Sequence, residues 1–216
     1  MTFTAAEMMI IGAALAAILM LGSRHLRANL LLFSVQTLFI AAATVFSGVE
    51  RAEPHLYLVA LAFICVKALG VPLFFMWIIR KIQVQSDTGT LLPAPMAMHL
   101  SIVLFGLSHL LTRGLPGIMS PEAGSPGAAG ALSLLFSGLL LMLTRRVAMS
   151  QIVGFLTMEN GIFLVALTQT SGMPLMVEMG ILLDVLVGVM IAGLLLFRIK
   201  SSFEHIDVTQ LTGLKD

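Results

Sequence analysis

Charged residues are scarce in this sequence. Asp, Glu, Lys and Arg make up 11% of 216 residues, whereas an ordinary soluble domain has about 25%. The formal net charge is +1 and no more than two cations stand side by side, so the charge pattern gives no basis for nucleic-acid binding. The composition therefore excludes an ordinary soluble domain and argues against a nucleic-acid partner.

Cysteine is equally rare. The one cysteine, Cys65, lies in an apolar run, so no disulfide framework is available. No His or Cys pair has the spacing of metal ligands, and the chain has neither a glycine-rich phosphate loop nor a nucleophile with a nearby base. We therefore expect no metal, cluster or other cofactor in this chain, and no catalytic site of its own.

Apolar residues dominate instead, at 58% of the chain with a mean hydropathy of +1.03. Seven segments are long enough to cross a bilayer, which takes roughly 20 mostly apolar residues. They are residues 5–22, 28–48, 55–79, 94–112, 127–144, 148–169 and 173–197. Glu7 rather than a basic segment accompanies the first, so we interpret it as a retained span and not a signal peptide. The sequence predicts an all-α, polytopic membrane protein with about seven transmembrane helices.

The cations outside the spans predict an orientation, because Lys and Arg collect on cytoplasmic loops. With the N-terminus outside, nine cations fall on the inner side: Arg24, Arg27, Arg80, Lys81, Arg145, Arg146, Arg198, Lys200 and Lys215. Only Arg51 and Arg113 fall outside. The bias predicts an N-out, C-in topology in the lipid bilayer.

A Gly-, Pro- and Ser-rich stretch at residues 114–126 cannot hold a helix and is predicted to be an outer loop. It divides the chain into a four-helix N-terminal region, residues 1–113, and a three-helix region, residues 127–200. Residues 201–216 form a predicted cytoplasmic tail.

Four ionisable residues lie deep inside the predicted spans: Lys67, Glu159, Glu178 and Asp184. A charge at the bilayer centre costs at least about 2.5–3.5 kcal/mol, so such groups normally face protein or water and mark ion pathways. Counted at 1.5 Å per residue, Lys67, Glu159 and Asp184 share a level roughly 16–18 Å below the outer surface. We interpret these three as candidate proton stations, with Glu178 on a branch nearer the surface. The alternative is that all four only hold helices together.

Two further features lie near these charges. His99 and His109 on the fourth span are candidate relay residues, although each is also explained by an interhelical hydrogen bond. Pro72 has no N–H to donate to the carbonyl of Ala68, which predicts a kink and a water site beside Lys67.

The C-terminal pattern resembles a known family. Gly-Phe-Leu-Thr-Met-Glu-Asn-Gly from Gly154, Met-Pro-Leu-Met-Val-Glu-Met-Gly-Ile-Leu-Leu-Asp-Val-Leu-Val-Gly from Met173, and a tail with Glu-His-Ile-Asp are similar to hydrogenase-4 component E. Val-Lys-Ala-Leu-Gly-Val-Pro from Val66 extends the resemblance to the N-terminal region. The last three helices of that family are similar to the K subunit of respiratory complex I and to the C subunit of multisubunit cation/proton antiporters.

This resemblance implies a membrane-arm subunit, without a redox centre, of a group 4 hydrogenase or formate hydrogenlyase in a prokaryotic cytoplasmic (inner) membrane. The implied partners are antiporter-like membrane subunits and a peripheral hydrogenase or other redox module. Glu159 and Asp184 take the positions of two glutamates on the lateral proton route of the K subunit, with the shorter aspartate at the second. Lys67 and Glu178 have no counterpart in the short relatives.

Three other functions stay open at this point. The chain is also compatible with a stand-alone cation/proton transporter or a component of a multisubunit antiporter, and with a purely structural membrane anchor. Transporters often show paired halves with broken helices, and a four-plus-three plan without visible symmetry counts against that class. An enzyme with a site inside the membrane is the least favoured.

Overall fold

The computed structural model describes residues 3–82, 90–114 and 125–169, together with Gly180 and Gly188. The chain divides into two compact units, Met1–Met176 and Val177–Asp216, and every element described below lies in the first. The described part of this unit is all helical.

The N-terminal half of the unit contains three spans. They are α1 (Ala5–Gly22), α2 (Leu26–Arg51) and a third span made of α3 (His55–Ala62), the π-helix η1 (Phe63–Gly70) and α4 (Val71–Ile82). Thr4 caps α1: its hydroxyl accepts from the Glu7 N–H at 3.2 Å, while the Glu7 carboxylate accepts from the Thr4 N–H at 3.0 Å. Ala52, in the left-handed conformation with φ 55°, ends α2 and starts the turn into α3.

The second half contains α5 (Ala94–Gly114), α6 (Pro126–Thr144) and α7 (Ala148–Gln169). Six helices of the described residues are therefore long and apolar enough to cross a membrane, with the third running over His55–Arg80. Each matches a predicted span to within three residues at either end. The predicted seventh span, residues 173–197, lies outside the described residues except for Gly180 and Gly188, and the N-out orientation stays a prediction.

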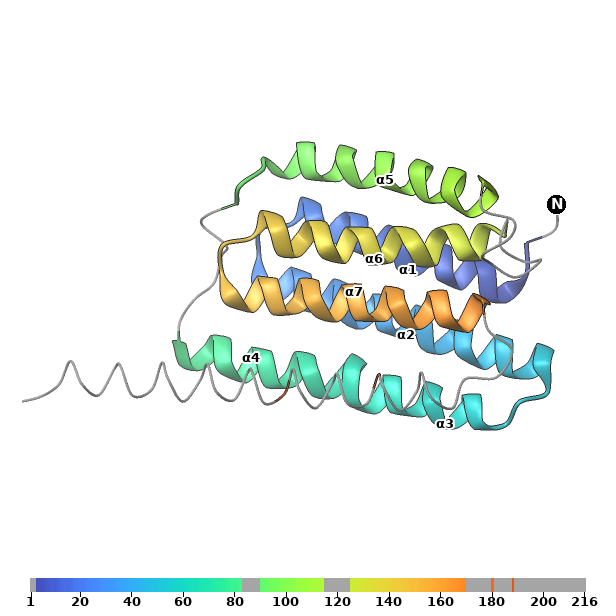
Figure 1. The fold of residues 1–216 in the computed structure, drawn as a ribbon. Helices are drawn as coiled ribbons and strands as arrows, with labels where there is room; N and C mark the ends of the chain where they lie inside the picture. The colour runs from blue at the N-terminus through green and yellow to red at the C-terminus, as the bar shows by residue number, and fades with distance from the viewer. Residues whose placement is uncertain (1–2, 83–89, 115–124, 170–179, 181–187, 189–216) are drawn as a thin grey trace, which may run out of the picture. The chain divides into compact units, whose positions relative to one another are not determined.

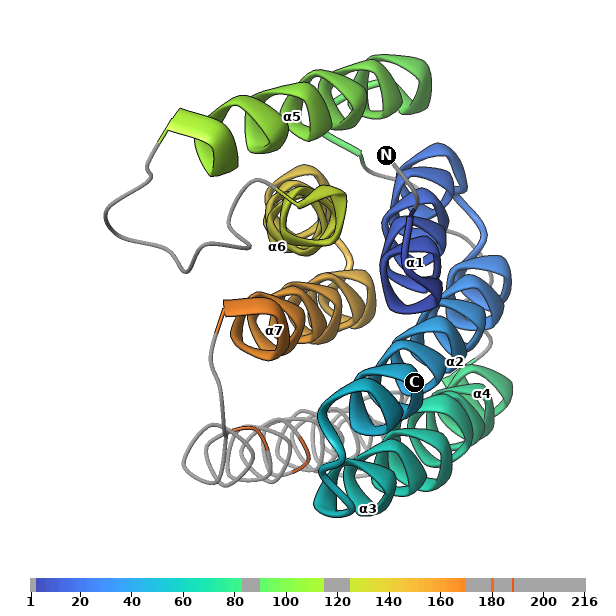
Figure 2. The same ribbon diagram turned by 90° about the vertical axis from the view of Figure 1, so that its right-hand side faces the viewer.

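The six spans form two rows. One row runs α1, α2 and the third span, and the other runs α5, α6 and α7 (Figures 1 and 2). The rows contact each other most extensively where α1 packs on α5 and α6 and where α2 packs on α7. Helices on both sides of residues 114–126 therefore pack together in one unit, and the proposed division into two regions at that loop stays a prediction from sequence.

Candidate functional site

The third span changes helix type where Lys67 lies. The Val71 N–H donates to the carbonyl of Val66, five residues back, as in a π-helix. Pro72 follows directly, and because its ring lacks an N–H and collides with the carbonyl four residues back, it disfavours a regular α-helix here. Where a kink was predicted at Pro72, the helix is widened, and Figure 1 shows it running on continuously into α4. The water site predicted beside Lys67 stays a prediction.

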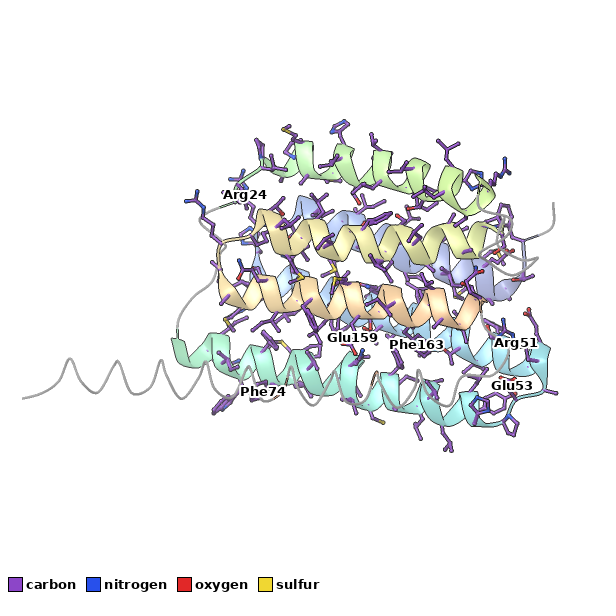
Figure 3. All side chains as sticks on the ribbon, viewed as in Figure 1. Arg24, Arg51, Glu53, Phe74, Glu159 and Phe163 are labelled. Carbon is purple, nitrogen blue, oxygen red and sulfur yellow. The ribbon has the colours of Figure 1, made fainter. Side chains whose placement is uncertain are left out.

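Close packing of α6 against α7 positions the other half of the site. Gly138, Gly154 and Gly161 lie where the two backbones meet: a Cβ on Gly154 would be 2.8 Å from the Met142 nitrogen. A side chain at Gly138 or Gly161 would likewise collide with the backbone of the facing helix. Glu159 is two residues from Gly161, about 200° around the helix. The glycine contacts with α6 therefore leave Glu159 on the side of α7 that faces the third span, as Figure 3 shows.

Lys67 and Glu159 form a buried ion pair between these elements. The Lys67 Nζ lies 3.2 Å from the Glu159 Oε1, and each side chain is only 4% exposed. The same Nζ donates to the Asn160 Oδ1 at 3.3 Å. The pair joins the first row of helices to the second across 92 residues of sequence.

Aromatic rings line the lysine. The Nζ is 4.9 Å from the centroid of the Phe63 ring, within the range of a cation–π contact. Phe63 in turn packs on Phe163 of α7, with 4.5 Å between ring centroids. The ammonium is thus surrounded by a carboxylate, an amide oxygen and the face of a ring.

This arrangement is able to hold a proton in more than one place. A lysine and a glutamate in contact form either an ion pair or a pair of neutral amine and neutral acid. The two forms differ by the transfer of one proton from the ammonium to the carboxylate. Burial disfavours isolated charges, so the balance between the two forms depends on neighbouring polar groups and water. The chemistry available here is the uptake, transfer or release of a proton.

Neither predicted histidine is brought to this pair. His99 is exposed on α5, with its Nδ1 2.6 Å from the carbonyl of Pro95, and His109 is half-buried on the same helix. Figures 1 and 2 show α5 on the far side of α6 from α7. Glu178 and Asp184 lie outside the described residues.

Three residues of the site were missed in the sequence. Asn160 was overlooked although it is a polar residue directly beside Glu159 in an apolar run, and Phe63 although it lies one helical turn before Lys67. Phe163 has no signal that separates it from an ordinary lipid-facing or core phenylalanine.

Arg145 was predicted as a cation on an inner loop, but its side chain is buried. It is 2% exposed, and its guanidinium donates to the carbonyls of Met20, Leu21 and Ser23 at 3.2, 3.1 and 2.7 Å. Arg145 therefore satisfies carbonyls at the C-terminal end of α1, a role favoured for cations by the helix dipole. Its exposed neighbour Arg146 has the same sequence context.

No group of three or more His, Cys, Asp or Glu side chains gathers like metal ligands within residues 3–82, 90–114 and 125–169. The expectation of a chain without metal or cofactor stays a prediction.

Comparison with known proteins gives the family. No family model and no solved structure matches the chain. An uncharacterized protein of Mycobacterium tuberculosis is 29% identical over 210 residues, which cover 95% of this chain and 93% of the relative. Hydrogenase-4 component E of Escherichia coli strain K12 and of Shigella flexneri is 32% identical over 166 residues, 76% of this chain and 75% of the relative. The chain therefore belongs to the hydrogenase-4 component E family.

Proposed function

We propose that this chain is a non-redox membrane subunit of a complex-I-related, hydrogenase-4-type complex, and that its Lys67–Glu159 pair is a station on a proton pathway. The observation that carries the proposal is the 3.2 Å contact between these two side chains, both 4% exposed and both within apolar spans. The relatives named as a hydrogenase-4 component support membership of a multisubunit complex.

A structural role is the competing explanation for the pair. Breaking a buried pair is costly, but apolar residues of similar volume often replace such a pair without loss of stability. Stability alone is therefore weak grounds for keeping two charges inside a membrane, whereas proton transfer requires titratable groups. The two explanations differ in what they expect of a neutral amide at Glu159.

Glu159→Gln tests the proposal. Glutamine keeps the shape and still accepts a hydrogen bond from Lys67, so the complex should assemble while proton translocation falls on the order of a hundredfold, because the titratable site is gone. The measurement is proton uptake or release by the intact complex in vesicles, with subunit content checked. Glu50→Gln, the same change at an exposed carboxylate on the last turn of α2, is the control. Normal translocation in fully assembled Glu159→Gln complex would leave only the structural role.

Asp184 extends this proposal to residues outside the described part of the chain. By sequence level and by the resemblance to the K subunit of respiratory complex I, we assign it as the second station, with Glu178 on a side branch. Asp184→Asn belongs in the same experiment, and it should lower translocation as Glu159→Gln does.

The proposed partners are antiporter-like membrane subunits and a peripheral hydrogenase or other redox module. The proposed setting is the cytoplasmic membrane of a prokaryote, with the N-terminus outside and the C-terminus inside. Reporter fusions after residues 89 and 124 should then report the cytoplasm and the outside, respectively, because residues 94–112 form a span between them. The same compartment at both positions would contradict this topology.

A further inference from the structure

Gln36 is a buried polar side chain on α2 that the ion pair does not explain. It is 0% exposed, and neither its Oε1 nor its Nε2 hydrogen-bonds to any of the described residues. The buried hydroxyls of Thr37 and Thr44 on the same helix are different, because they donate to the carbonyls of Phe33 and Ile40 at 2.8 Å. A buried primary amide has two N–H donors and a carbonyl acceptor, which protein or water normally satisfies.

Gln36 lies on the interior side of α2. At about 100° per residue, it is about 60° around the helix from Phe39, which lies against α1, and about 120° from Gly48, which lies against α3. The exposed Leu38 is about 160° away. Because α2 also packs on α7, the Gln36 side of the helix faces the second row, between α1 and the third span (Figure 2).

Gln36 is also level with Lys67. A Cβ on Gly48 would be 3.2 Å from the Leu56 Cβ, which fixes the register between α2 and the antiparallel third span. Counting away from this contact, Gln36 lies twelve residues along α2, or about 18 Å, and Lys67 lies eleven residues along the third span, or about 16.5 Å. The two residues are therefore within about one helical turn of the same depth.

Asn160 supplies the complementary group. Its Oδ1 accepts from Lys67, while its Nδ2 has no hydrogen-bond partner among the described residues. An internal water needs two to four polar partners, and the Gln36 amide together with the Asn160 N–H offers both an acceptor and donors.

We propose that Gln36 is a positioning residue of the Lys67–Glu159 site, and that its amide and Asn160 hold an internal water beside the pair. Gln36 then acts on the ammonium through Asn160, and the water gives the proton a route to and from the pair. The claim that this water carries the proton rests on the proposed function. The claim that Gln36 and Asn160 hold a water does not.

The described elements that pack against α2 contain few ionisable groups that could act on Gln36. Lys67 on η1 and Glu159 on α7 are the ones in mid-span. The others lie near helix ends or, for Cys65, on an exposed side of the third span: Glu7, His55, Tyr57, Cys65, Arg80 and Lys81. A change in the pH dependence of transport on altering Gln36 would therefore report on the pair.

Gln36→Met is the first test, because methionine keeps the length and volume of glutamine and removes the amide. In the intact complex in vesicles, we expect normal subunit content, a roughly three- to tenfold fall in proton translocation, and a shifted midpoint of its pH profile. Thr44→Val is the matched control: it removes a buried hydroxyl from the same helix that is already satisfied by Ile40, and it should leave both quantities unchanged. A uniform fall in rate without a shift would overturn the proposal, since that is the effect of a packing residue.

Gln36→Glu is the second test and decides the matter if Gln36→Met does not assemble. It keeps the shape and adds a carboxyl group, so it should shift the pH profile strongly if Gln36 lies within one water of the pair. A profile identical to that of the unaltered complex would overturn the proposal. Glu159→Gln, measured alongside, separates the two claims. Normal translocation in Glu159→Gln refutes the proposed function. Impaired translocation in Glu159→Gln, together with a normal rate and pH profile in the Gln36 variants, refutes only the role of Gln36.

Discussion

Removing one partner of the Lys67–Glu159 pair should cost far more stability than removing both. Lys67→Met leaves the Glu159 carboxylate in a site where it is 4% exposed, and breaking such a pair costs about 3–5 kcal/mol. At about 2–4 °C per kcal/mol for a chain of this size, the unfolding midpoint should fall by about 6–20 °C. Glu159→Gln should cost less, about 1–3 kcal/mol, because the amide oxygen still accepts from the ammonium.

The double variant Lys67→Met/Glu159→Leu, compared with Lys67→Met alone and Glu159→Leu alone, completes the cycle. It fills the same space with apolar atoms, so it should come within about 1 kcal/mol of the unaltered chain or exceed it. The assay is loss of this subunit from the detergent-extracted complex on heating. Glu53→Gln is the control, since Glu53 is paired with His55 at 3.7 Å on the exposed turn before α3 and should change stability by at most about 1 kcal/mol. If Lys67→Met matched the unaltered chain, or if the double variant lost the sum of the two single losses, the reasoning about the pair would be refuted.

Gly138→Ala and Pro72→Ala test the supports of the site, and Gly106→Ala is the control for the first. Gly138→Ala should destabilise the subunit by about 1–3 kcal/mol because its methyl group meets the backbone of α7. Gly106→Ala, with nothing within 4 Å, should instead stabilise α5 by about 0.5–1 kcal/mol, and equal effects of the two in the heating assay would contradict the close contact of α6 and α7. Pro72→Ala removes the residue that disfavours an α-helix, so η1 should revert towards α-helical geometry. The subunit should then gain up to about 3 kcal/mol of stability. Proton translocation should fall, because Lys67 rotates relative to α4. Unchanged or raised translocation in Pro72→Ala would separate the π-helix from function.

The spans were predictable because apolar length is a property of the sequence alone. Residues 5–22 and 148–169 coincide with α1 and α7, and the other described spans differ by three residues or fewer. That Lys67 and Glu159 share one level along their helices was also predictable, since the helical rise converts residue counts into distance. Their depth in a bilayer stays a prediction. Their contact was not predictable, because depth does not say which helices are neighbours, and Glu159 was expected chiefly beside Asp184.

Local geometry was the other part that the sequence did not reveal. Pro72 predicted a kink, but a kink and a π-helix relieve the same clash and have the same sequence signal. Arg145 and Arg146 are adjacent identical residues, and only the packing of the α6–α7 turn against α1 buries the first and exposes the second. Pairing and capping between distant segments are properties of the packed bundle rather than of any one segment.

The location of the irregular features supports a functional rather than a structural explanation of the site. Residues 63–70 contain a π-helix and a buried lysine, and each of these two departs from what stability alone favours in a membrane span. A π-helix is rare and often marks a functional site, an intramembrane charge is costly, and both occur in the same eight residues. The contacts among the helices of the second row follow the ordinary rules of membrane packing: glycines lie at the α6–α7 contact, and a 2.7 Å bond between the buried hydroxyls of Ser101 and Ser137 joins α5 to α6. Helix contacts of this kind require neither a π-helix nor a buried lysine in the third span. Departures from local rules concentrated at one site are the pattern expected where function and not stability has set the residues.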